Sequence, residues 1–103
     1  MTEMSSEKKH FFIRLNPPRA TFPSDITEEE RNVMQRHIAY WKPYLNDGTL
    51  IVFGPVMDPK ATFGIAVLAV DNEEQARQLV NNDPATALGT VDIFPMKAVT
   101  KQN

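Results

Sequence analysis

The chain has 103 residues, of which 42% are hydrophobic and 23% charged, and its formal net charge at pH 7 is -2. These values exclude a disordered or fibrous protein and predict one globular domain over residues 8–99, between tails at residues 1–7 and 100–103. The absence of cysteine excludes disulfides and thiol catalysis, and without a basic cluster nucleic acid is not an expected partner.

The predicted elements begin with a strand over residues 9–16, where "HFFIRLN" is rich in aromatic and β-branched residues, before a loop with three prolines in "PPRATFPSD". A helix is predicted from Glu28, because Thr27 can cap the amide of Glu30 while the Glu30 side chain returns to the Thr27 amide. The turn "NDG" at residues 46–48 should end this helix, and Pro43 should kink its last turn.

Two strands are predicted after the helix. The segment "TLIVFGPVM" predicts a strand with a bulge or a strand edge at Gly54 and Pro55, and after the turn "DPKAT" the apolar run "FGIAVLAV" predicts the next strand. A second helix is expected with Asp71 as its cap, ending before the junction of Asp83 and Pro84, and "TVDIFPMKAV" predicts the last strand. The order βαββαβ predicts an α+β protein with the ferredoxin-like fold.

Both faces of the predicted strands are apolar. In "FGIAVLAV", for example, Ile65 and Val67 alternate with Ala66 and Leu68. Two helices cover only one face of a sheet in this fold, so the other face needs a partner. We expect a homodimer through the open sheet face, with about 1,600 Å² buried if the interface is of standard size.

The surroundings of the chain can also be predicted. No apolar run approaches the roughly 20 residues of a membrane helix, and the opening "MTEMSSEKK" lacks the apolar core of a signal peptide. We therefore expect a cytoplasmic protein with no membrane partner. The chain has two histidines and no cysteine, which makes a poor metal site, and no metal or other cofactor is expected.

His37 lies near the middle of the apolar face of the first predicted helix. A histidine there either bonds to backbone groups within the core or acts as a general base or acid, since imidazole both takes and returns a proton near pH 7. A base of this kind needs an orienting carboxylate. Asp83 is the first candidate, because the two helices of this fold lie side by side, although Asp before proline is also ordinary turn chemistry. Glu30, on the same helix face, is the second.

Five further residues could contribute to substrate binding. Arg14 and Arg19 could hold an anionic group by a guanidinium fork, or form surface salt bridges. Trp41, one turn after His37, could wall a pocket for a flat substrate or simply pack in the core. Gly54 and Pro55 together could bend the strand to open a cavity, or protect a sheet edge.

Several of these segments resemble, in their order and spacing, the YCII-related domain family. They are "RHIAYW" with His37, "NDG" before "LIVFGPV", "FGIAVLAV", "NDP" with Asp83, and the late "FPM". The resemblance spans residues 8–99 and implies a dimeric α/β barrel on a ferredoxin-like core, related to muconolactone-isomerase-like proteins. It also implies a catalytic pair of His37 and Asp83. The loop "NPPRATFPSDITEEE" is longer than in compact members, so pocket shape and substrate do not carry over.

Three functions are compatible with these features. The first is a small enzyme of the lyase or isomerase type that transfers a proton without a metal, acting on a compact anionic or cyclic metabolite. The second is a non-catalytic dimeric module that binds a small ligand or a partner protein in the same pocket. The third is an RNA-binding domain, which shares the βαββαβ order, but Ile65 stands where a stacking aromatic is needed and the chain is acidic overall.

Overall fold

The structure, a computed structural model, describes residues 7–101, so residues 1–6 and 102–103 of the two predicted tails lie outside the described residues. Strands and helices follow one another in the predicted order βαββαβ, with one short 3₁₀ helix, η2, before the last strand. The elements are β1 (Lys9–Leu15), α1 (Glu28–Asp47), β2 (Leu50–Val56), β3 (Phe63–Val70), α2 (Glu73–Asn81), η2 (Pro84–Ala87) and β4 (Val91–Met96).

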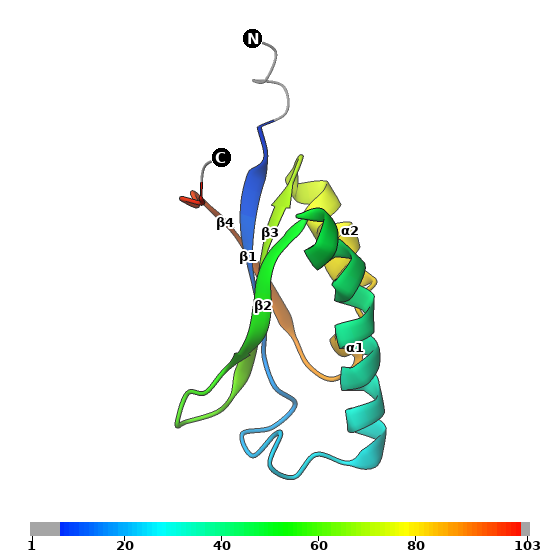
Figure 1. Cartoon of the computed structure of the whole chain (residues 1–103). Coiled ribbons are helices and arrows are strands. Elements are labelled where there is room, and N and C mark those ends of the chain that lie inside the picture. The colour runs from blue at the N-terminus through cyan, green and yellow to red at the C-terminus, as the bar shows by residue number, and fades with distance from the viewer. Residues whose placement is uncertain (1–6, 102–103) are drawn as a thin grey trace.

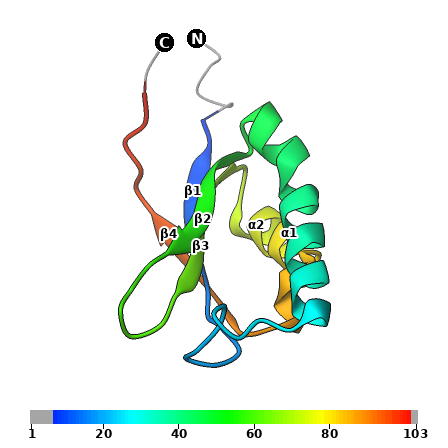
Figure 2. The same ribbon diagram turned by 60° about the horizontal axis from the view of Figure 1, so that its bottom comes forward.

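The four strands form one antiparallel sheet in the order β2-β3-β1-β4. Both helices pack on the same face of this sheet, and the opposite face carries no element of the described chain (Figures 1 and 2). Strand order and helix placement together are those of the ferredoxin-like fold, so the predicted α+β class and topology are confirmed.

Helix α1 has the predicted ends. The Thr27 side chain accepts a hydrogen bond from the Glu30 amide at 3.1 Å, and the Glu30 carboxylate accepts one from the Thr27 amide at 3.0 Å, which completes the capping box. The helix continues through Pro43 to Asp47 and is closed by Gly48, whose φ of 87° lies in the left-handed region that favours glycine.

The predicted cap of the second helix was wrong by one residue. Asn72, not Asp71, has the extended backbone of a cap, and its side chain accepts a hydrogen bond from the Gln75 amide at 2.8 Å. The Asp71 carboxylate instead accepts a hydrogen bond from the Lys8 ammonium. Asn and Asp cap helices about equally well, so two neighbouring candidates could not be separated by residue type.

Strand β2 lies at an edge of the sheet, as the glycine and proline in it predicted. The register shift occurs between Leu50 and Val52, however, whereas Pro55 and Gly64 oppose each other in regular pairing. Of the two predicted alternatives at Gly54 and Pro55, the strand edge is confirmed and the bulge is not found, because a proline on an edge strand can turn its missing donor toward solvent.

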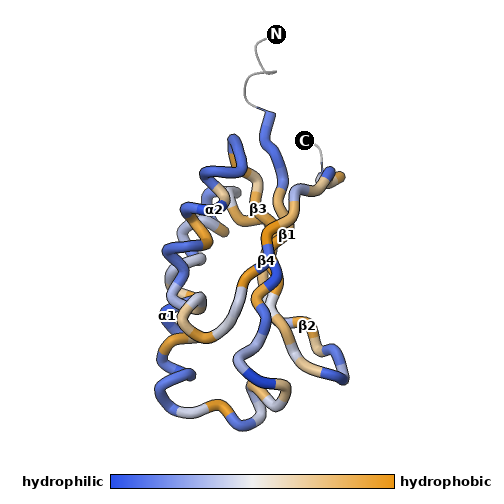
Figure 3. The backbone as a smooth tube through the Cα atoms, turned by 180° about the vertical axis from the view of Figure 1, so that it is seen from behind, coloured by the Kyte–Doolittle hydropathy of each residue, from blue (hydrophilic) through white to orange (hydrophobic). Residues whose placement is uncertain are grey.

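The core lies between the sheet and the helices. Its largest fully buried side chains are Trp41, Leu50, Leu68 and Val70, and hydrophobic residues run along the strands in Figure 3. Among the described residues, Asp83 is the one charged side chain in this buried class, at 8% exposure. Burying a carboxylate is costly unless donors surround it, so its contacts decide what this part of the molecule can do.

The loop between β1 and α1 closes the end of the space between sheet and helices (Figure 2). The start of this loop is fixed at Asn16, whose backbone amide donates to the backbone carbonyl of Thr90 at 2.8 Å. A Cβ added to Gly89 would overlap the Asn16 carbonyl oxygen, so this position requires glycine for the close approach of the two segments.

Within the described residues, no helix is both long and apolar enough to cross a membrane.

Candidate active site

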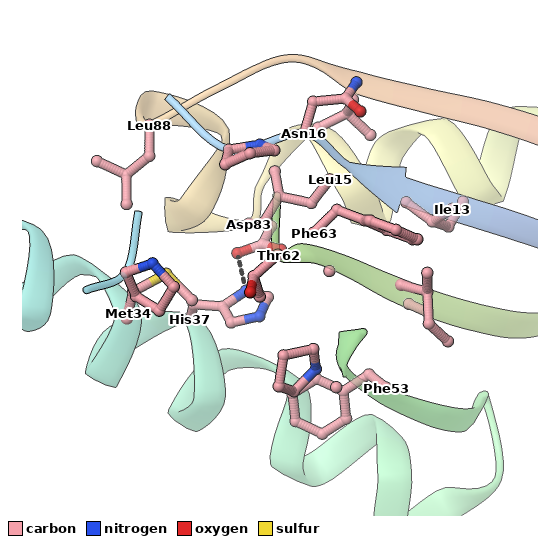
Figure 4. A pocket seen from close by; sticks show the side chains of 18 of the residues that line it. Ile13, Leu15, Asn16, Met34, His37, Phe53, Thr62, Phe63, Asp83 and Leu88 are labelled. Atoms are coloured by element: carbon pink, nitrogen blue, oxygen red, sulfur yellow. Dashed lines mark hydrogen bonds and ion pairs between the residues drawn. The ribbon is translucent and has the colours of Figure 1, made fainter. Parts of the chain in front are cut away.

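His37 and Asp83 meet between α1 and the start of η2. The Nδ1 atom of His37 lies 2.8 Å from Oδ1 and 2.9 Å from Oδ2 of Asp83 (Figure 4). Asp83 is placed there because Pro84 cannot continue helix α2, so Asp83 takes an extended backbone and becomes the cap of η2. The structure thus brings together the two residues that the sequence only suggested as partners.

The Asp83 carboxylate accepts hydrogen bonds from two further donors. The indole Nε1–H of Trp41 donates to Oδ2 at 2.8 Å, and the amide of Ala85 donates to Oδ1 at 2.9 Å. Asp83 therefore serves both as a turn cap and as the partner of His37, and the two interpretations of this residue hold at once. Three donors around one buried carboxylate satisfy the hydrogen-bonding capacity that burial would otherwise leave unpaired.

This arrangement determines the tautomer of the imidazole. An ionised carboxylate only accepts hydrogen bonds, so the Nδ1 atom of a neutral His37 carries the proton and Nε2 carries a free lone pair. Within residues 7–101, Nε2 has no hydrogen-bond partner, and no buried side-chain nitrogen or oxygen lacks one. Nε2 is therefore not sealed in the core but opens onto the space beside it.

That space is a cavity of about 490 Å³ between α1, the sheet and the loop over residues 16–26. Its volume is within the range of sites for small molecules. The residues that line it are mostly apolar; they include Ile13, Leu15, Phe22, Met34, Phe53, Leu88 and Val91. Asn16, Thr62, His37 and Asp83 are the polar side chains among the lining residues (Figure 4).

Trp41 belongs both to the core and to the site. It is 2% exposed and packs edge-on against Tyr40 and Tyr44, with ring centroids 4.9 and 5.7 Å away. It also lines the cavity, as do Gly54 and Pro55. The hydrogen bond from Trp41 to Asp83 was not anticipated, and it makes the tryptophan a support for the carboxylate as well as a wall.

The two arginines lie outside the cavity lining. The guanidinium of Arg14 stacks at 3.9 Å over the ring of Phe63, and its Nε donates to Asn16. Arg14 alternates with Ile13, which is buried under the helices, so its side chain belongs to the opposite face of the sheet. Substrate binding by Arg14 or Arg19 stays a prediction. Neither arginine is among the lining residues, although Arg14 contacts two residues that are, Phe63 and Asn16.

Arg19 is engaged within its own loop. Its guanidinium forms ion pairs with Asp25 at 2.9 Å and with Glu30 at 2.8 Å. Hydrogen bonding to Arg19, followed by the bond from the Thr27 amide, lowers the pKa of Glu30 from 4.5 to about 2. Glu30 is therefore committed to Arg19 and the helix cap, and Asp83 is the carboxylate that pairs with His37.

Some residues of the site were missed by sequence reasoning. Phe53 packs edge-on against the imidazole, with ring centroids 5.8 Å apart and an interplanar angle of 70°. Its side of the strand followed from alternation, since Phe53 opposes Ala66, which is buried under the helices. Phe22, Asn16 and Thr62 lie in or beside loops, and the sequence does not predict which way the side chains of such residues point.

Comparison with known proteins identifies the family. The sequence pattern of the YCII-related domain matches residues 11–100. The chain belongs to the YCII-related family. A curated relative from Emericella nidulans, named derivative of benzaldehyde biosynthesis cluster protein C, is 31% identical over 75 residues, which are 64% of this chain and 76% of the relative.

One solved structure similar to this YCII-related chain is a protein of unknown function from Nitrosomonas europaea. It is 15% identical, has a TM-score of 0.46, and the match covers 96% of this chain and 98% of the other. Neither comparison specifies a reaction, so the chemistry has to be argued from the site itself.

Proposed function

We propose that this YCII-related protein is a proton-transfer enzyme of the lyase or isomerase type, in which His37 is the general base and acid. The observation that supports the proposal is the fixed imidazole: Asp83 occupies Nδ1, while Nε2 faces a cavity of about 490 Å³. A base with one nitrogen held by a carboxylate and the other open to a ligand has the geometry that proton abstraction needs.

The reaction would proceed in two proton transfers. Nε2 takes a proton from a carbon or oxygen of the bound substrate, and the electron pair of the broken bond stays on the substrate. The imidazolium is stabilised by the carboxylate of Asp83, to which Trp41 and the Ala85 amide also donate. The proton then returns to another atom of the substrate, which gives an isomer, or to a leaving group, which gives elimination. Neither step requires a metal.

The fungal relative supports a setting in small-molecule metabolism, because its name places it in a biosynthesis cluster for a benzaldehyde derivative. We extend only that setting to this chain. The substrate is proposed as a small organic molecule with an acidic C–H or O–H bond that reaches Nε2 at hydrogen-bond distance.

The proposal is tested by exchange of acidic protons. Wild-type protein is incubated in D₂O with a panel of small cyclic ketones and lactones, and loss of the α-proton signal is followed by ¹H NMR. For any compound that exchanges, we expect His37→Gln to lower the rate on the order of 10²–10⁴-fold, since this is what general acid–base catalysis contributes.

The matched control is His10→Gln, because His10 is the other histidine of the chain and lies on β1 outside the cavity lining. His10→Gln should retain the wild-type rate, and both variants should keep the wild-type unfolding temperature within a few degrees. A His37→Gln variant that exchanges as fast as wild type would refute the mechanism. A compound that binds both proteins equally without exchange would favour the non-catalytic binding module.

A further inference from the structure

The walls of the cavity restrict the chemistry of its ligand. Three phenylalanines, Phe22, Phe53 and Phe63, line it together with Trp41 and Met34. Aromatic rings favour flat apolar partners through edge-to-face and offset contacts, and a methionine adapts its shape to them. The polar groups among the lining residues are few, so the affinity of a ligand depends more on its shape and its buried apolar area than on hydrogen bonds.

The charges around the cavity restrict it further. No lysine or arginine is among the lining residues, and the titratable groups there are His37 and Asp83. Arg14 stacks on Phe63 and donates to Asn16 without entering the lining, and Arg19 pairs with Asp25 and Glu30. A carboxylate or phosphate entering this apolar space would lose its hydration with no cation to replace it.

An anionic ligand would also conflict with the base. A carboxylate placed at Nε2 is held well only by a protonated imidazole, which would then lie between it and Asp83 and could no longer accept a proton. A neutral acid has no such conflict, because proton transfer to Nε2 creates the imidazolium and the substrate anion together as a pair. The site is thus suited to charge that forms during the reaction rather than charge that arrives with the ligand.

We infer that the cavity takes an uncharged, flat aromatic or conjugated cyclic molecule, such as a phenol or a cyclic enone, whose one polar group meets Nε2 of His37. This inference rests on the proposed function for the role of Nε2, but its charge and shape arguments depend on the walls alone. Of the two substrate types expected from the sequence, anionic or cyclic, it favours a cyclic molecule without charge.

The test compares two probes that share one flat ring system and differ in the charge of the polar group. Binding of 2-naphthol, which is neutral at pH 7.5, and of 2-naphthoate is measured by ¹H–¹⁵N NMR titration of the full chain, with the amides of Phe53 and Thr62 reporting on the cavity. We expect 2-naphthol to bind at least tenfold more tightly, which is about 1.4 kcal/mol. Equal or tighter binding of 2-naphthoate, or no binding of either probe at millimolar concentration, would overturn the inference.

Two variants, Met34→Lys and His37→Gln, test the charge of the walls and the role of the base separately. Met34→Lys places an ammonium beside the cavity and should raise 2-naphthoate affinity at least tenfold, whereas Met57→Lys, at a residue 72% exposed and outside the lining, should change neither affinity. An unchanged preference in Met34→Lys would count against the inference.

His37→Gln should keep the preference for 2-naphthol, because the preference comes from the walls and Asp83 rather than from proton transfer. If wild-type protein shows this preference but exchanges no compound of the panel, the enzyme is refuted and the ligand class stands. Intact exchange with a preference for 2-naphthoate would do the reverse.

Discussion

Asp83 organises the candidate site through the donors that surround it. His37 Nδ1, Trp41 Nε1 and the Ala85 amide all point at one carboxylate whose side chain is 10% exposed. Each of these donors needs an acceptor, so the carboxylate determines which nitrogen of His37 is left for chemistry. The proton-transfer proposal therefore depends on the tautomer at His37 as much as on its position.

Asp83→Asn tests this dependence. An asparagine of the same shape offers one acceptor oxygen and turns an NH₂ donor toward His37 or Trp41, so a donor would face a donor. We expect part or all of the His37 population to move its proton to Nε2, where it can no longer act as a base, and any exchange activity to fall on the order of 10²–10⁴-fold. Long-range ¹H–¹⁵N correlation of the imidazole nitrogens at a pH where His37 is neutral measures the tautomer directly.

Asp58→Asn is the matched control, since Asp58 also accepts a backbone amide in a turn but lies outside the lining of the cavity. It should leave the imidazole spectrum unchanged. If Asp83→Asn also leaves His37 with its proton on Nδ1, the carboxylate is not what sets the tautomer. The stability of Asp83→Asn should fall by about 1–3 kcal/mol, because a buried donor loses its acceptor.

At the scale of elements, the loop before α1 is held by a network centred on Arg19. Its guanidinium bonds the Asp25 carboxylate and, through both terminal nitrogens, the two oxygens of Glu30. Glu30 also completes the cap of α1. The network therefore connects the loop that carries Phe22 over the cavity to the helix that carries His37.

Glu30→Gln removes the carboxylate charge of residue 30 from this network. The variant should therefore be less stable than wild type, by an amount that depends on pH. In the folded protein the pKa of Glu30 is lowered from 4.5 to about 2, mainly by Arg19, so folding favours the ionised form. The stabilisation is fully present above about pH 4.5 and disappears as the pH falls toward 2. Wild type should thus unfold at a higher temperature than Glu30→Gln at pH 6, with the difference closing by pH 2.

The control for this prediction is Glu29→Gln, at the exposed neighbouring position in the same first turn of α1. It carries the same change of charge near the helix N-terminus but does not touch the Arg19 network. A Glu30→Gln variant whose unfolding temperature differs from wild type by the same amount at every pH would show that ionisation of Glu30 does not stabilise the loop.

The elements were largely predictable because their signals are local. The Thr27–Glu30 capping box, the "NDG" turn and the apolar run of β3 each depend on neighbours within a few residues. The site was less predictable, since the fold brings Asp83 near His37 but the contact depends on how η2 starts. Side chains alternate between the two faces along β1, which places Arg14 on the face opposite Ile13. The prediction that Arg14 could anchor a substrate did not take this alternation into account.

In the molecule as residues 7–101 describe it, one face of the sheet carries no helix. On this face Phe12 opposes Phe94 across β1 and β4, and their ring centroids lie 6.4 Å apart. Phe94 is 51% exposed and Val52, on the far edge strand, is 49% exposed. Apolar side chains across a full sheet face are more than a monomer normally exposes, which supports the predicted homodimer.

We propose that two copies pack through this face, and Phe94→Glu tests it. A carboxylate there would replace an apolar contact between the two copies, so the dimer should weaken at least tenfold while the cavity, on the other side of the sheet, stays intact. Sedimentation equilibrium measures the mass against 11.7 kDa for one chain. Leu45→Glu, at a position 39% exposed on α1, is the matched control and should remain dimeric, because α1 lies on the covered face. A wild-type protein that sediments as a single chain, or a Phe94→Glu protein that dimerises as tightly as wild type, would refute this interface.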